Sequence, residues 1–586
     1  MTAFLGVERS LSGRRWVGLD LSHEGLAQSI AQETGLPEIL CRTLARRGVA
    51  ADQAAEFIAP TLKSLMPDPS RLKAMDTAVS RISNAVTSGE AIAIFADYDV
   101  DGGCSAALLI QWFRAFGQNV TLYVPDRIDE GFGPNEAAMA MLAKDHQLII
   151  CVDCGTLSHG PIAAAKGADV IVLDHHQGGE TLPGATAVVN PNRQDESGDF
   201  GYLCAAGVVF LTLVALNRLM RRQDKQTPDL LPCLDLVALA TVADVAPLIG
   251  LNRALVRQGL KIMARRQRPG LRALGDVARL DSAPNAFHLG FLLGPRVNAG
   301  GRIGKSDLGA RLLSTQDEHE AAALAARLDA LNTERREVEA GVRLQALEQA
   351  GSRDMTGPLV WAANDGWHPG VVGIVAARLK ETANRPAVVI GFDGDEGKGS
   401  GRSINGVDLG AAIARLTREG LLQKGGGHKM AAGLSLSRDQ LEPAMQRLSA
   451  LLAKQGADKA GPADLQLDGV IAPRAATIEL IQQLEMAGPF GAGASAPRFA
   501  LPAQRIAFAK RVGESHLRLT VQDESGGRLD AIAFQAFDGD PKTALGPALL
   551  NHAGALFHVA GRLEIDTWGG RQKPKLRLED AAAVDP

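Results

Sequence analysis

The stretch AIAIFADYDVDG (residues 91–102) decides the fold class, because a short apolar run ends there in three closely spaced aspartates. Two similar runs follow at LIICVD (148–153) and VIVLD (170–174), and each of them also ends in an aspartate. Buried strands that alternate with helices are typical of a parallel, doubly wound sheet. Segments of helical pattern lie between the runs, around 106–116, 135–144 and 161–166. The sequence therefore predicts an α/β domain with acids at three strand ends.

These acids are expected to meet at one edge of the sheet, where doubly wound folds bind their ligands. Asp97, Asp99 and Asp101 would repel one another when packed together, and a bound cation relieves such repulsion. Asp153 ends the second run, and the sequence Asp-His-His at 174–176 ends the third. The 21 residues from Asp153 to Asp174 suffice for one helix and one strand, so both acids can face one cleft.

Asp244, in ATVADVAP (240–247), can complete this set of acids, although a helix cap or a solvated loop is the other interpretation of that residue alone. Carboxylate oxygens together with imidazole nitrogens suit Mn²⁺, and they suit Mg²⁺ where carboxylates and water dominate. Two such ions about 3.5–4 Å apart clamp the attacking and leaving oxygens of a phosphoryl transfer. The sequence thus predicts a site for two hard metal ions.

The composition limits the classes of protein to which the chain can belong. At roughly 150 residues per domain, a length of 586 residues predicts about four domains. Apolar residues make up 46% and charged residues 22%, which argues against wholesale disorder. The net charge of −4 excludes a uniformly basic coat for nucleic acid, but it allows a local basic groove. The 17 Phe, 5 Trp and 3 Tyr leave few rings for a base-stacking surface.

Cysteine usage and hydropathy indicate a cytoplasmic protein. Six cysteines are too few for a disulfide framework in a chain of this length. Cys151 and Cys154 form one C-x-x-C, but no second pair accompanies it as most structural zinc sites require. The longest apolar run, GVVFLTLVAL (207–216), is much shorter than the ~20 residues of a membrane span. We therefore expect a buried helix there, no signal peptide and no membrane contact.

The predicted elements divide the chain into five regions. A long helical stretch begins near Thr315 and Glu318, which have capping-box spacing, and it ends near Gly351. A helix of this length would span about 50 Å, either as a rigid connector between two lobes or packed along one domain. The regions are 1–80, mostly helical; 81–315, the parallel-sheet domain; 316–352, the connector helix; 353–455, a second, smaller α/β domain; and 466–586, a small β-barrel of the OB type.

The second α/β domain and the barrel are recognised from short apolar segments. LVWAA (359–363) and AVVIG (387–391) are predicted strands that flank a helix at 371–379. The glycine-rich segments GKGSGRS (397–403) and GGGH (425–428) are predicted turns, whose backbone N–H groups can approach a phosphate closely. Short alternating strands separated by turns favour an OB-type barrel. These strands are expected at 516–521, 528–534, 556–565 and 575–580.

Together these motifs resemble the DHH phosphoesterases, a family named for the Asp-His-His found here at 174–176. The family's motifs occur in order as DYDVDG (97–102), VDCG (152–155), LDHH (173–176), TVADVAPL (241–248) and GPRVNAGGR (294–302). Three more resemble the DHH-associated domain: GWHPGVVGIVAARL (366–379), SGRS (400–403) and GGGHKMAAG (425–433). PFGAGASAPRF (489–499) opens a region similar to the OB fold of the single-strand-specific exonucleases in that family. The resemblance covers roughly residues 40–580.

The resemblance implies roles for individual residues. The implied metal ligands are Asp99, Asp101, Asp153, His175 and Asp244, with Asp153 bridging two ions. His176 resembles the residue beside the scissile phosphate, and Asp97 and Asp174 are implied to support the catalytic site by orienting histidines. Nucleic-acid contacts are expected from Asn298, Arg302, His368, Arg402, Ser403, Gly426, Gly427 and His428. The candidate contacts in the barrel are Lys510, Arg511, Arg518, Trp568, Arg571, Lys573 and Lys575, a basic set with one ring.

The resemblance implies a metal-dependent exonuclease that hydrolyses single-stranded DNA in DNA repair and recombination. It also implies two ions of Mn²⁺ or Mg²⁺, cleavage in the 5′→3′ direction and release of 5′-mononucleotides. A single-strand-binding protein and a helicase are the expected protein partners, and we expect a monomer. Strand specificity would come from a narrow groove between lobes and from a sequence-tolerant barrel.

Three alternatives compete with this hypothesis. A relative that binds single strands without cutting them would be expected to lack some of the ligands. A sibling enzyme for short oligonucleotides or cyclic dinucleotides would generally lack the barrel after residue 465. A nucleotide triphosphatase would need a phosphate-binding loop, but AGGRIGKS (299–306) has Ala299 where glycine is required, and the preceding GPRVN is a poor strand.

Overall fold

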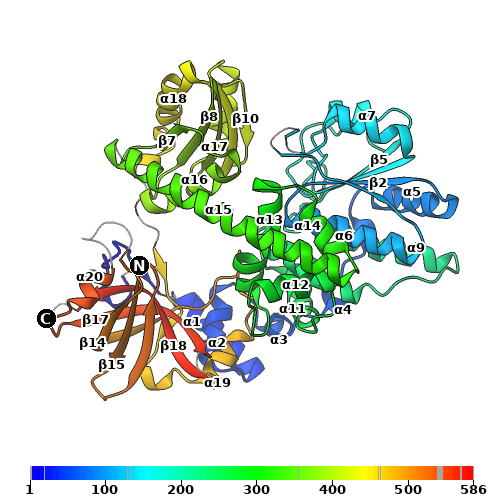
Figure 1. Ribbon diagram of the computed structural model, residues 1–586. Coiled ribbons are helices and arrows are strands. Elements are labelled where there is room, and N and C mark those ends of the chain that lie inside the picture. Colours follow the sequence, from blue (N-terminus) through cyan, green and yellow to red (C-terminus); the bar gives the residue numbers. More distant parts are fainter. Residues whose placement is uncertain are drawn as a thin grey trace. The chain divides into compact units, whose positions relative to one another are not determined.

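The computed structural model describes residues 3–18, 20–127, 130–131, 133–353, 355–459, 461, 464–537, 545–567 and 571–584. The chain forms two compact units. One unit is Leu65–Ala460, and the other combines Met1–Ser64 with Gly461–Pro586. Each unit is described in turn below, beginning with the one that carries the acid cluster (Figure 1).

The first sheet of the Leu65–Ala460 unit is parallel throughout, as the three apolar runs predict. Its strand order is β3-β2-β4-β5-β6. The strands are β2 (Ile92–Ala96), β3 (Thr121–Tyr123), β4 (Leu148–Val152), β5 (Asp169–Leu173) and β6 (Ala187–Val189). Every residue of β2 and β4 is buried, which explains why these runs are apolar without alternation.

Helices cover both faces of this sheet (Figure 1). Helix α7 (Glu136–Asp145) and α8 (His159–Ala164) pack on one face, where Met139 and Ile162 join a core with Phe95. Helices α5 (Met75–Ser88), α6 (Val100–Ala115) and α9 (Ala205–Arg222) lie on the other. The apolar run 207–216 is buried within α9, as predicted.

A helical layer completes this half of the unit. Its members are α10 (Leu234–Ala243), α11 (Gly250–Met263), α12 (Pro269–Val277), a π-helix η5 (His288–Leu293), α13 (Gly294–Ile303) and α14 (Leu308–Ser314). The glycine-rich segment at 299–306 lies largely in α13, directly after the π-helix and not after a strand. It therefore lacks the strand–loop–helix context of a phosphate-binding loop, which rules out the triphosphatase alternative.

The predicted connector is helix α15 (Glu318–Ser352), 35 residues long. It packs against α12, α13 and α14 in the first half of the unit and against α16 and β7 in the second. Its start differs from the predicted capping box, because Asp317 is the N-cap and accepts a hydrogen bond from the N–H of Glu320. Thr315 instead donates to the Glu320 carboxylate over 2.6 Å, so it fixes the turn before the helix.

The second sheet has the order β10-β11-β9-β8-β7 and carries three helices. Its elements are β7 (Val360–Asp365), α16 (Pro369–Ala383), β8 (Ala387–Asp393), β9 (Glu396–Arg402), α17 (Leu409–Arg418), β10 (Lys424–Gly427), β11 (Ala431–Ser437) and α18 (Leu441–Ala453). The prediction of turns at the glycine-rich segments is wrong, since 396–402 and 424–427 are strands. A Cβ on Gly399 would lie 2.7 Å from Cγ1 of Ile390, and one on Gly401 would lie 2.7 Å from Cδ2 of Leu409. Glycine is used there because the packed sheet face leaves no room for a side chain.

The other unit joins the two ends of the chain. Strand β1 (Trp16–Val17) pairs with β12 (Leu465–Gln466), and the Trp16 indole donates to Asp580 over 2.9 Å. The helices α1 (Leu21–Thr34), α2 (Glu38–Arg46) and α19 (Ile478–Glu485) also belong to it. The N-terminal region is thus not a separate module but a structural part of the barrel unit.

The barrel follows the predicted OB-type pattern, with one strand more than the sequence indicated. Its strands are β14 (Phe499–Val512), β15 (His516–Gln522), β16 (Arg528–Ala533), β17 (Leu556–Asp566) and β18 (Lys573–Ala583). The order β14-β15-β16-β18-β17 is closed by pairing between β14 and β17. A core that includes Phe499, Leu519 and Leu576 fills the interior.

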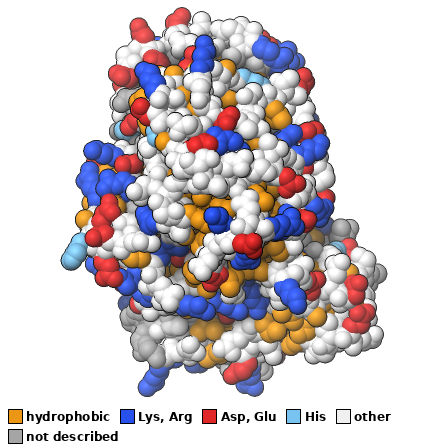
Figure 2. Space-filling view, turned by 90° about the vertical axis from the view of Figure 1, so that its right-hand side faces the viewer, with side chains coloured by type: hydrophobic (Ala, Val, Ile, Leu, Met, Phe, Trp, Pro, Cys, Tyr) orange, Lys and Arg blue, Asp and Glu red, His pale blue; other side chains and the backbone are white. Residues whose placement is uncertain are grey.

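All six cysteines are buried free thiols, as expected for a chain without a disulfide framework. Within the described residues, no helix combines the length and the apolar character that crossing a bilayer requires. Acidic and basic side chains are interspersed over the face drawn in Figure 2, consistent with 66 acids and 62 bases.

Candidate active site

The acid cluster forms because three adjacent parallel strands end at the same level. Ala96 of β2 pairs in register with Val152 of β4, and Val152 pairs with Leu173 of β5. The next residue after each strand is therefore an aspartate at one sheet edge: Asp97, Asp153 and Asp174. This edge is the one at which the sequence places the site.

Asp99 and Asp101 are held by the N-termini of two helices. Asp99 is the N-cap of α6 and accepts hydrogen bonds from the N–H groups of Asp101 and Gly102. Asp101 accepts from the N–H groups of Ala205 (2.6 Å) and Ala206 (2.8 Å), at the start of α9. Helix N-termini stabilise negative charge, so these hydrogen bonds fix both carboxylates in place.

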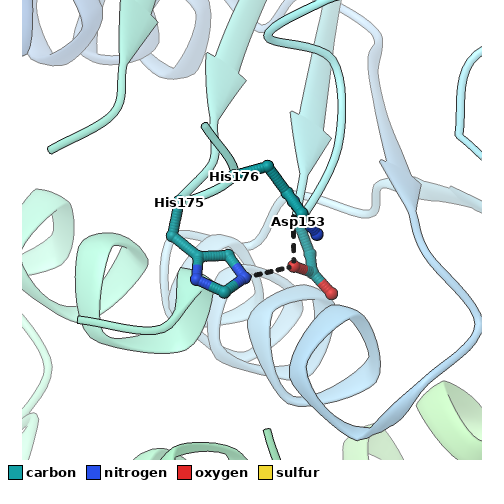
Figure 3. Close-up of side chains that lie close together, drawn as sticks. All are labelled: Asp153, His175 and His176. Carbon is teal, nitrogen blue, oxygen red and sulfur yellow. Dashed lines mark ion pairs between the residues drawn. The ribbon is translucent and has the colours of Figure 1, made fainter. Parts of the chain in front are cut away.

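Asp153 lies at the centre of the cluster, only 2% exposed. Its φ of 61° is in the left-handed region, an unfavourable conformation for a residue with a Cβ that is typical of functional sites. Oδ1 lies 3.2 Å from Nε2 of His175 and 3.9 Å from Nδ1 of His176, and Figure 3 shows these two contacts. The same oxygen accepts no hydrogen bond from the part of the chain that the structure describes.

The cluster brings several buried carboxyl groups close together, and this raises their pKa values. Burial, followed by the charges of neighbouring aspartates, raises the pKa of Asp153 well above its usual range. The same two causes raise the pKa of Asp97 to about 7 and that of Asp244 to about 8. In the metal-free chain the protonated form of these carboxyls is favoured. A bound divalent metal would favour the ionised form.

Donor atoms from the cluster form three overlapping groups, in each of which they lie within 4.8 Å of one another. The groups are Asp97, Asp99 and Asp153; Asp101, His175 and Asp244; and Asp153, His175 and His176. Asp153 and His175 each belong to two groups, and the Asp153 carboxylate can contact two neighbouring cation positions because it has two oxygens. All five predicted ligands are brought together, and Asp97, which the sequence interpretation assigned a supporting role, has the geometry of a ligand as well.

Asp174 orients His176 and has no oxygen left for a metal. Oδ1 accepts from Nδ1 of His176 at 2.8 Å, and Oδ2 accepts from the hydroxyl of Thr156 at 2.6 Å. Asn190 donates to that hydroxyl and to the backbone oxygen of His176. Although burial disfavours the charged imidazole, the hydrogen bond and charge of Asp174 raise the pKa of His176 to about 9. Sequence reasoning missed Thr156 and Asn190, since neither stands in a distinctive motif.

The glycine-rich end of β10 reaches the same site from the second sheet. The ring of His428 stacks on that of His176, with centroids 6.5 Å apart and planes inclined by 20°. Gly426 and Gly427 are exposed beside it, and a Cβ on Gly427 would lie 2.3 Å from the backbone oxygen of Ala431. Burial, and then the charges of His176 and His175, lower the pKa of His428. The structure therefore brings these three predicted residues to the acid cluster.

A group of arginines adjoins the cluster. Arg402 is largely buried, and burial, then the charges of Arg302 and Arg127, lower its pKa. Arg302 donates to the backbone oxygen of Gly370 over 3.0 Å, and Arg127 donates to the Tyr98 hydroxyl over 2.7 Å. The charges of Asp97 and Asp99 act on Arg127, so the arginines lie near the acids. Three guanidinium groups this close favour an anion between them.

Three residues predicted to contact nucleic acid make structural hydrogen bonds within the chain. Asn298 accepts from the N–H of Val100 at 3.0 Å, so it holds the loop that carries Asp99 and Asp101. Ser403 is 1% exposed and donates to the backbone oxygen of Val407, and His368 caps α16 by accepting from the N–H of Gly370. His368 is half-buried beside Arg127, whose charge together with burial lowers its pKa.

Two of the predicted basic residues of the barrel, Lys510 and Arg518, lie on a sheet face that also carries exposed rings omitted from the sequence interpretation. Lys510 pairs directly with Arg518, and both side chains are exposed. Phe508, 48% exposed, precedes Lys510 on the same face, and the 47% exposed ring of Phe534 lies 5.1 Å from the Arg577 guanidinium. These rings could have been found in the sequence as phenylalanines at the outward-facing positions of alternating strands.

Two of the remaining barrel candidates make contacts with other side chains. Arg511 packs over Phe537, and Lys575 pairs with Asp566 at 3.1 Å. Arg571 and Lys573 are exposed. Trp568 lies outside the described residues.

Three family models match the chain in the order that these elements suggest. Residues 91–241 match the DHH family, N-terminal domain; residues 356–454 match the DHHA1 domain; and residues 467–580 match the RecJ OB domain. The matches cover the first sheet, the second sheet and the barrel, and they confirm the predicted fold class.

Similar proteins extend over almost the whole chain. The single-stranded-DNA-specific exonuclease RecJ of Escherichia coli (strain K12) is 37% identical over 569 residues, covering 93% of this chain and 96% of the relative. RecJ of Bacillus subtilis (strain 168) is 32% identical over 570 residues, covering 95% and 70%. The crystal structure of RecJ in complex with Mn²⁺ from Thermus thermophilus has a TM-score of 0.81 at 28% identity, covering 97% of this chain and 80% of that one. A second structure of that protein, in complex with Mg²⁺, has a TM-score of 0.74. The chain therefore belongs to the RecJ family of DHH phosphoesterases.

Proposed function

We propose that this chain is a metal-dependent exonuclease that hydrolyses single-stranded DNA from the 5′ end and releases 5′-mononucleotides. The observation that carries the proposal is the overlap of the donor groups, which share Asp153 and His175. Two positions that share ligands suit a pair of divalent ions, and Mn²⁺ or Mg²⁺ fits the donor chemistry.

The residues present fit such cations on grounds of charge and of unused donors. The Asp153 oxygen that accepts no hydrogen bond within the described residues faces two imidazoles. Asp97, Asp99, Asp101, Asp153, His175 and Asp244 would hold the metal. When bound, divalent cations supply Lewis-acid activation and stabilise the negative charge that develops on a phosphate.

His176 contributes a fixed positive charge of the chain's own. In the metal-free chain the hydrogen bond and charge of Asp174 raise its pKa to about 9, which favours the protonated imidazole. The Nε2–H group then remains as a donor to a phosphate oxygen at the cluster. A donor aimed at the charge that builds up in the transition state raises turnover more than it raises substrate affinity.

The arginine group supports the 5′ polarity. A terminal 5′-phosphate carries more charge than an internal phosphodiester, and Arg127, Arg302 and Arg402 offer three guanidinium groups next to the acids. A strand whose terminal phosphate occupies this group would present its first phosphodiester to the metal ligands. One mononucleotide would then leave in each cycle.

The barrel supports a substrate longer than a few nucleotides. Exposed Lys510 and Arg518 neutralise phosphates, and Phe508 and Phe534 offer faces on which unpaired bases stack. This unit disfavours the alternative of an enzyme for short oligonucleotides or cyclic dinucleotides. The complete ligand set disfavours a relative that only binds strands. The roles in repair and recombination, the protein partners, the monomeric state and the cytoplasmic location stay predictions.

Digestion of end-labelled DNA tests the proposal. A forty-nucleotide strand and its duplex are incubated with the protein in Mn²⁺, in Mg²⁺ and in EDTA. We expect 5′-labelled mononucleotide from the single strand at the earliest times, slower release without a 5′-phosphate, and no release in EDTA. Early release of a 3′ label would contradict the polarity, and equal digestion of the duplex would contradict the substrate class.

A further inference from the structure

Two phenylalanine rings are exposed and stacked on the π-helix η5 and the residue before it. Phe287 is 54% exposed and Phe291 is 70% exposed. Their centroids are 5.1 Å apart and their planes differ by 22°, so they present one continuous aromatic surface. Reciprocal hydrogen bonds between Asn285 and His288 fix the turn that carries them. Burying such rings would normally stabilise the fold. Their exposure on an ordered turn therefore indicates a binding surface.

This turn packs directly on the backbone that carries predicted metal ligands. A Cβ on Gly290 would lie 3.4 Å from Cγ1 of Val242, and one on Gly294 would lie 3.2 Å from Cβ of Ala243. These two residues end α10 immediately before Asp244. The turn that carries the two rings therefore packs on the end of α10. π-helical turns are rare and frequently occur at functional sites.

Val245 adds an exposed apolar side chain next to Asp244. It is 69% exposed, and its φ of 59° is strained for a β-branched residue. A strained backbone that turns a valine into solvent weakens the fold, and such strain clusters at functional sites. Val245 and the turn that carries Phe287 and Phe291 thus both lie at the end of α10 that leads into Asp244.

We propose that Phe287 and Phe291, bordered by Val245, form a stacking platform for unpaired DNA bases next to the metal centre. This inference rests on the proposed function and adds a device that selects single strands there. A base has an apolar π-face that stacks on an aromatic ring whatever its identity. In a duplex that face is covered by the neighbouring base pair, so only an unpaired base can use the platform. The site's acids and arginines act on phosphates, whereas these rings act on bases.

Fluorescence of 2-aminopurine reports the stacking directly. The base is placed at successive positions from the 5′ end of a forty-nucleotide strand, and binding is measured in EDTA so that the strand is not consumed. We expect quenching at one or two positions near the 5′ end. The double variant Phe287→Ala/Phe291→Ala should lose that quenching, and Phe287→Tyr/Phe291→Tyr should retain it. Leu344→Ala is the matched control, because Leu344 of α15 is also 70% exposed.

Kinetics in Mn²⁺ give a second, independent measurement. Each ring that stacks a base should change kcat/KM on single strands by about 5- to 150-fold when it is replaced by Ala. The affinity for Mn²⁺, measured by titration calorimetry, should stay at the wild-type value. A fall in Mn²⁺ affinity would mean that the rings only support Asp244, and self-association lost in the double variant would mean that the platform binds a second copy. Either result overturns the inference, as does unchanged quenching and kcat/KM in a protein that still digests single strands. A wild-type chain that digests no strand refutes the proposed function instead.

Discussion

The imidazole of His428, at the end of β10, stacks on the imidazole of His176, which follows β5, with ring centroids 6.5 Å apart. The two residues come from different sheets of the Leu65–Ala460 unit. A substrate phosphate near His176 is therefore close to the exposed glycines at 426 and 427. Residues that follow strands of both sheets lie together here, although all the acids come from the half of the unit that holds the first sheet.

Replacing Asp153 by Ala should abolish cleavage, because the shared carboxylate sets both the spacing and the charge balance of the cation positions. We expect turnover in saturating Mn²⁺ to fall by more than about 100-fold, the usual scale for removing one electrostatic group from a catalytic site. Asp145→Ala, an exposed acid at the end of α7, is the control and should behave like wild type. Substantial residual activity of Asp153→Ala would show that Asp153 is not the shared ligand.

His176→Ala should lower kcat by about 100-fold or more while Mn²⁺ affinity changes little, because the charged imidazole acts on the transition state and not on the ion. Single-turnover kinetics and titration calorimetry separate the two quantities. His146→Ala, which lies away from the cluster, is the control for loss of a histidine as such. If Mn²⁺ binding collapses together with the rate, His176 is a ligand and the role assigned to it is wrong.

The metal-free protein should lose stability as pH rises from about 4 to about 8. In the unfolded chain these carboxyls titrate near 3.8, whereas the folded values are about 7 for Asp97 and about 8 for Asp244. The folded state therefore binds more protons across this interval, and the free energy of unfolding falls as pH rises. His176, raised from 6.5 to about 9, acts in the same direction at the upper end, since its contribution is lost as pH rises through 9.

Thermal unfolding with and without Mn²⁺ measures this effect. The Tm gain on adding Mn²⁺ should be larger at pH 8 than at pH 5.5, because the cation replaces protons that the cluster otherwise holds. Asp244→Asn should flatten the dependence of the metal-free Tm on pH. An equal Tm gain at both pH values would contradict the proton–metal exchange.

A fragment of residues 65–460 should cleave a four-nucleotide strand about as well as the whole chain but should bind a forty-nucleotide strand less tightly. The cluster lies wholly in this unit, and the barrel with its basic face lies in the other. The log of the affinity should also fall less steeply with the log of salt concentration, because fewer phosphates are neutralised. Circular dichroism establishes that the fragment is folded. Equal losses on both lengths would show that the barrel unit helps to build the active site.

Within the whole chain, Phe534→Ala tests the barrel surface without truncation. Loss of a stacking ring should weaken binding of the long strand by about 1–3 kcal/mol and leave the salt dependence unchanged. Lys510→Ala/Arg518→Ala should instead reduce the salt dependence. Fluorescence anisotropy over a range of salt concentrations distinguishes the two effects, and identical salt slopes for the two variants would contradict the separate roles.

The aspartates at one edge of the first sheet could be predicted because each of them directly follows a buried apolar run. The local sequence pattern therefore coincides with the position in the fold. Strands β9 and β10 could not, because their glycines depend on side chains that come from distant parts of the sequence, such as Leu409 of α17 against Gly401. The sequence also did not predict the roles of Arg127, Thr156 and Asn190. Each is an ordinary residue in the sequence, and only the packing of distant segments places it beside Tyr98, Asp174 or His176. Conversely, Ser403 belongs to a conspicuous motif and proves to be buried.

The pairing of the chain's two ends has a consequence for the order in which the protein is made. Trp16 leaves the ribosome hundreds of residues before its partners Leu465 and Asp580. The unit of residues 65–460 can fold during synthesis, because domains generally fold as they emerge. Val7 and Trp16 must wait uncovered, because they are buried in a cluster whose other members come from residues 465–582. A message truncated before codon 465 would therefore yield a folded metal-binding unit that trails an unprotected N-terminal segment, which is the preferred substrate of cellular proteases.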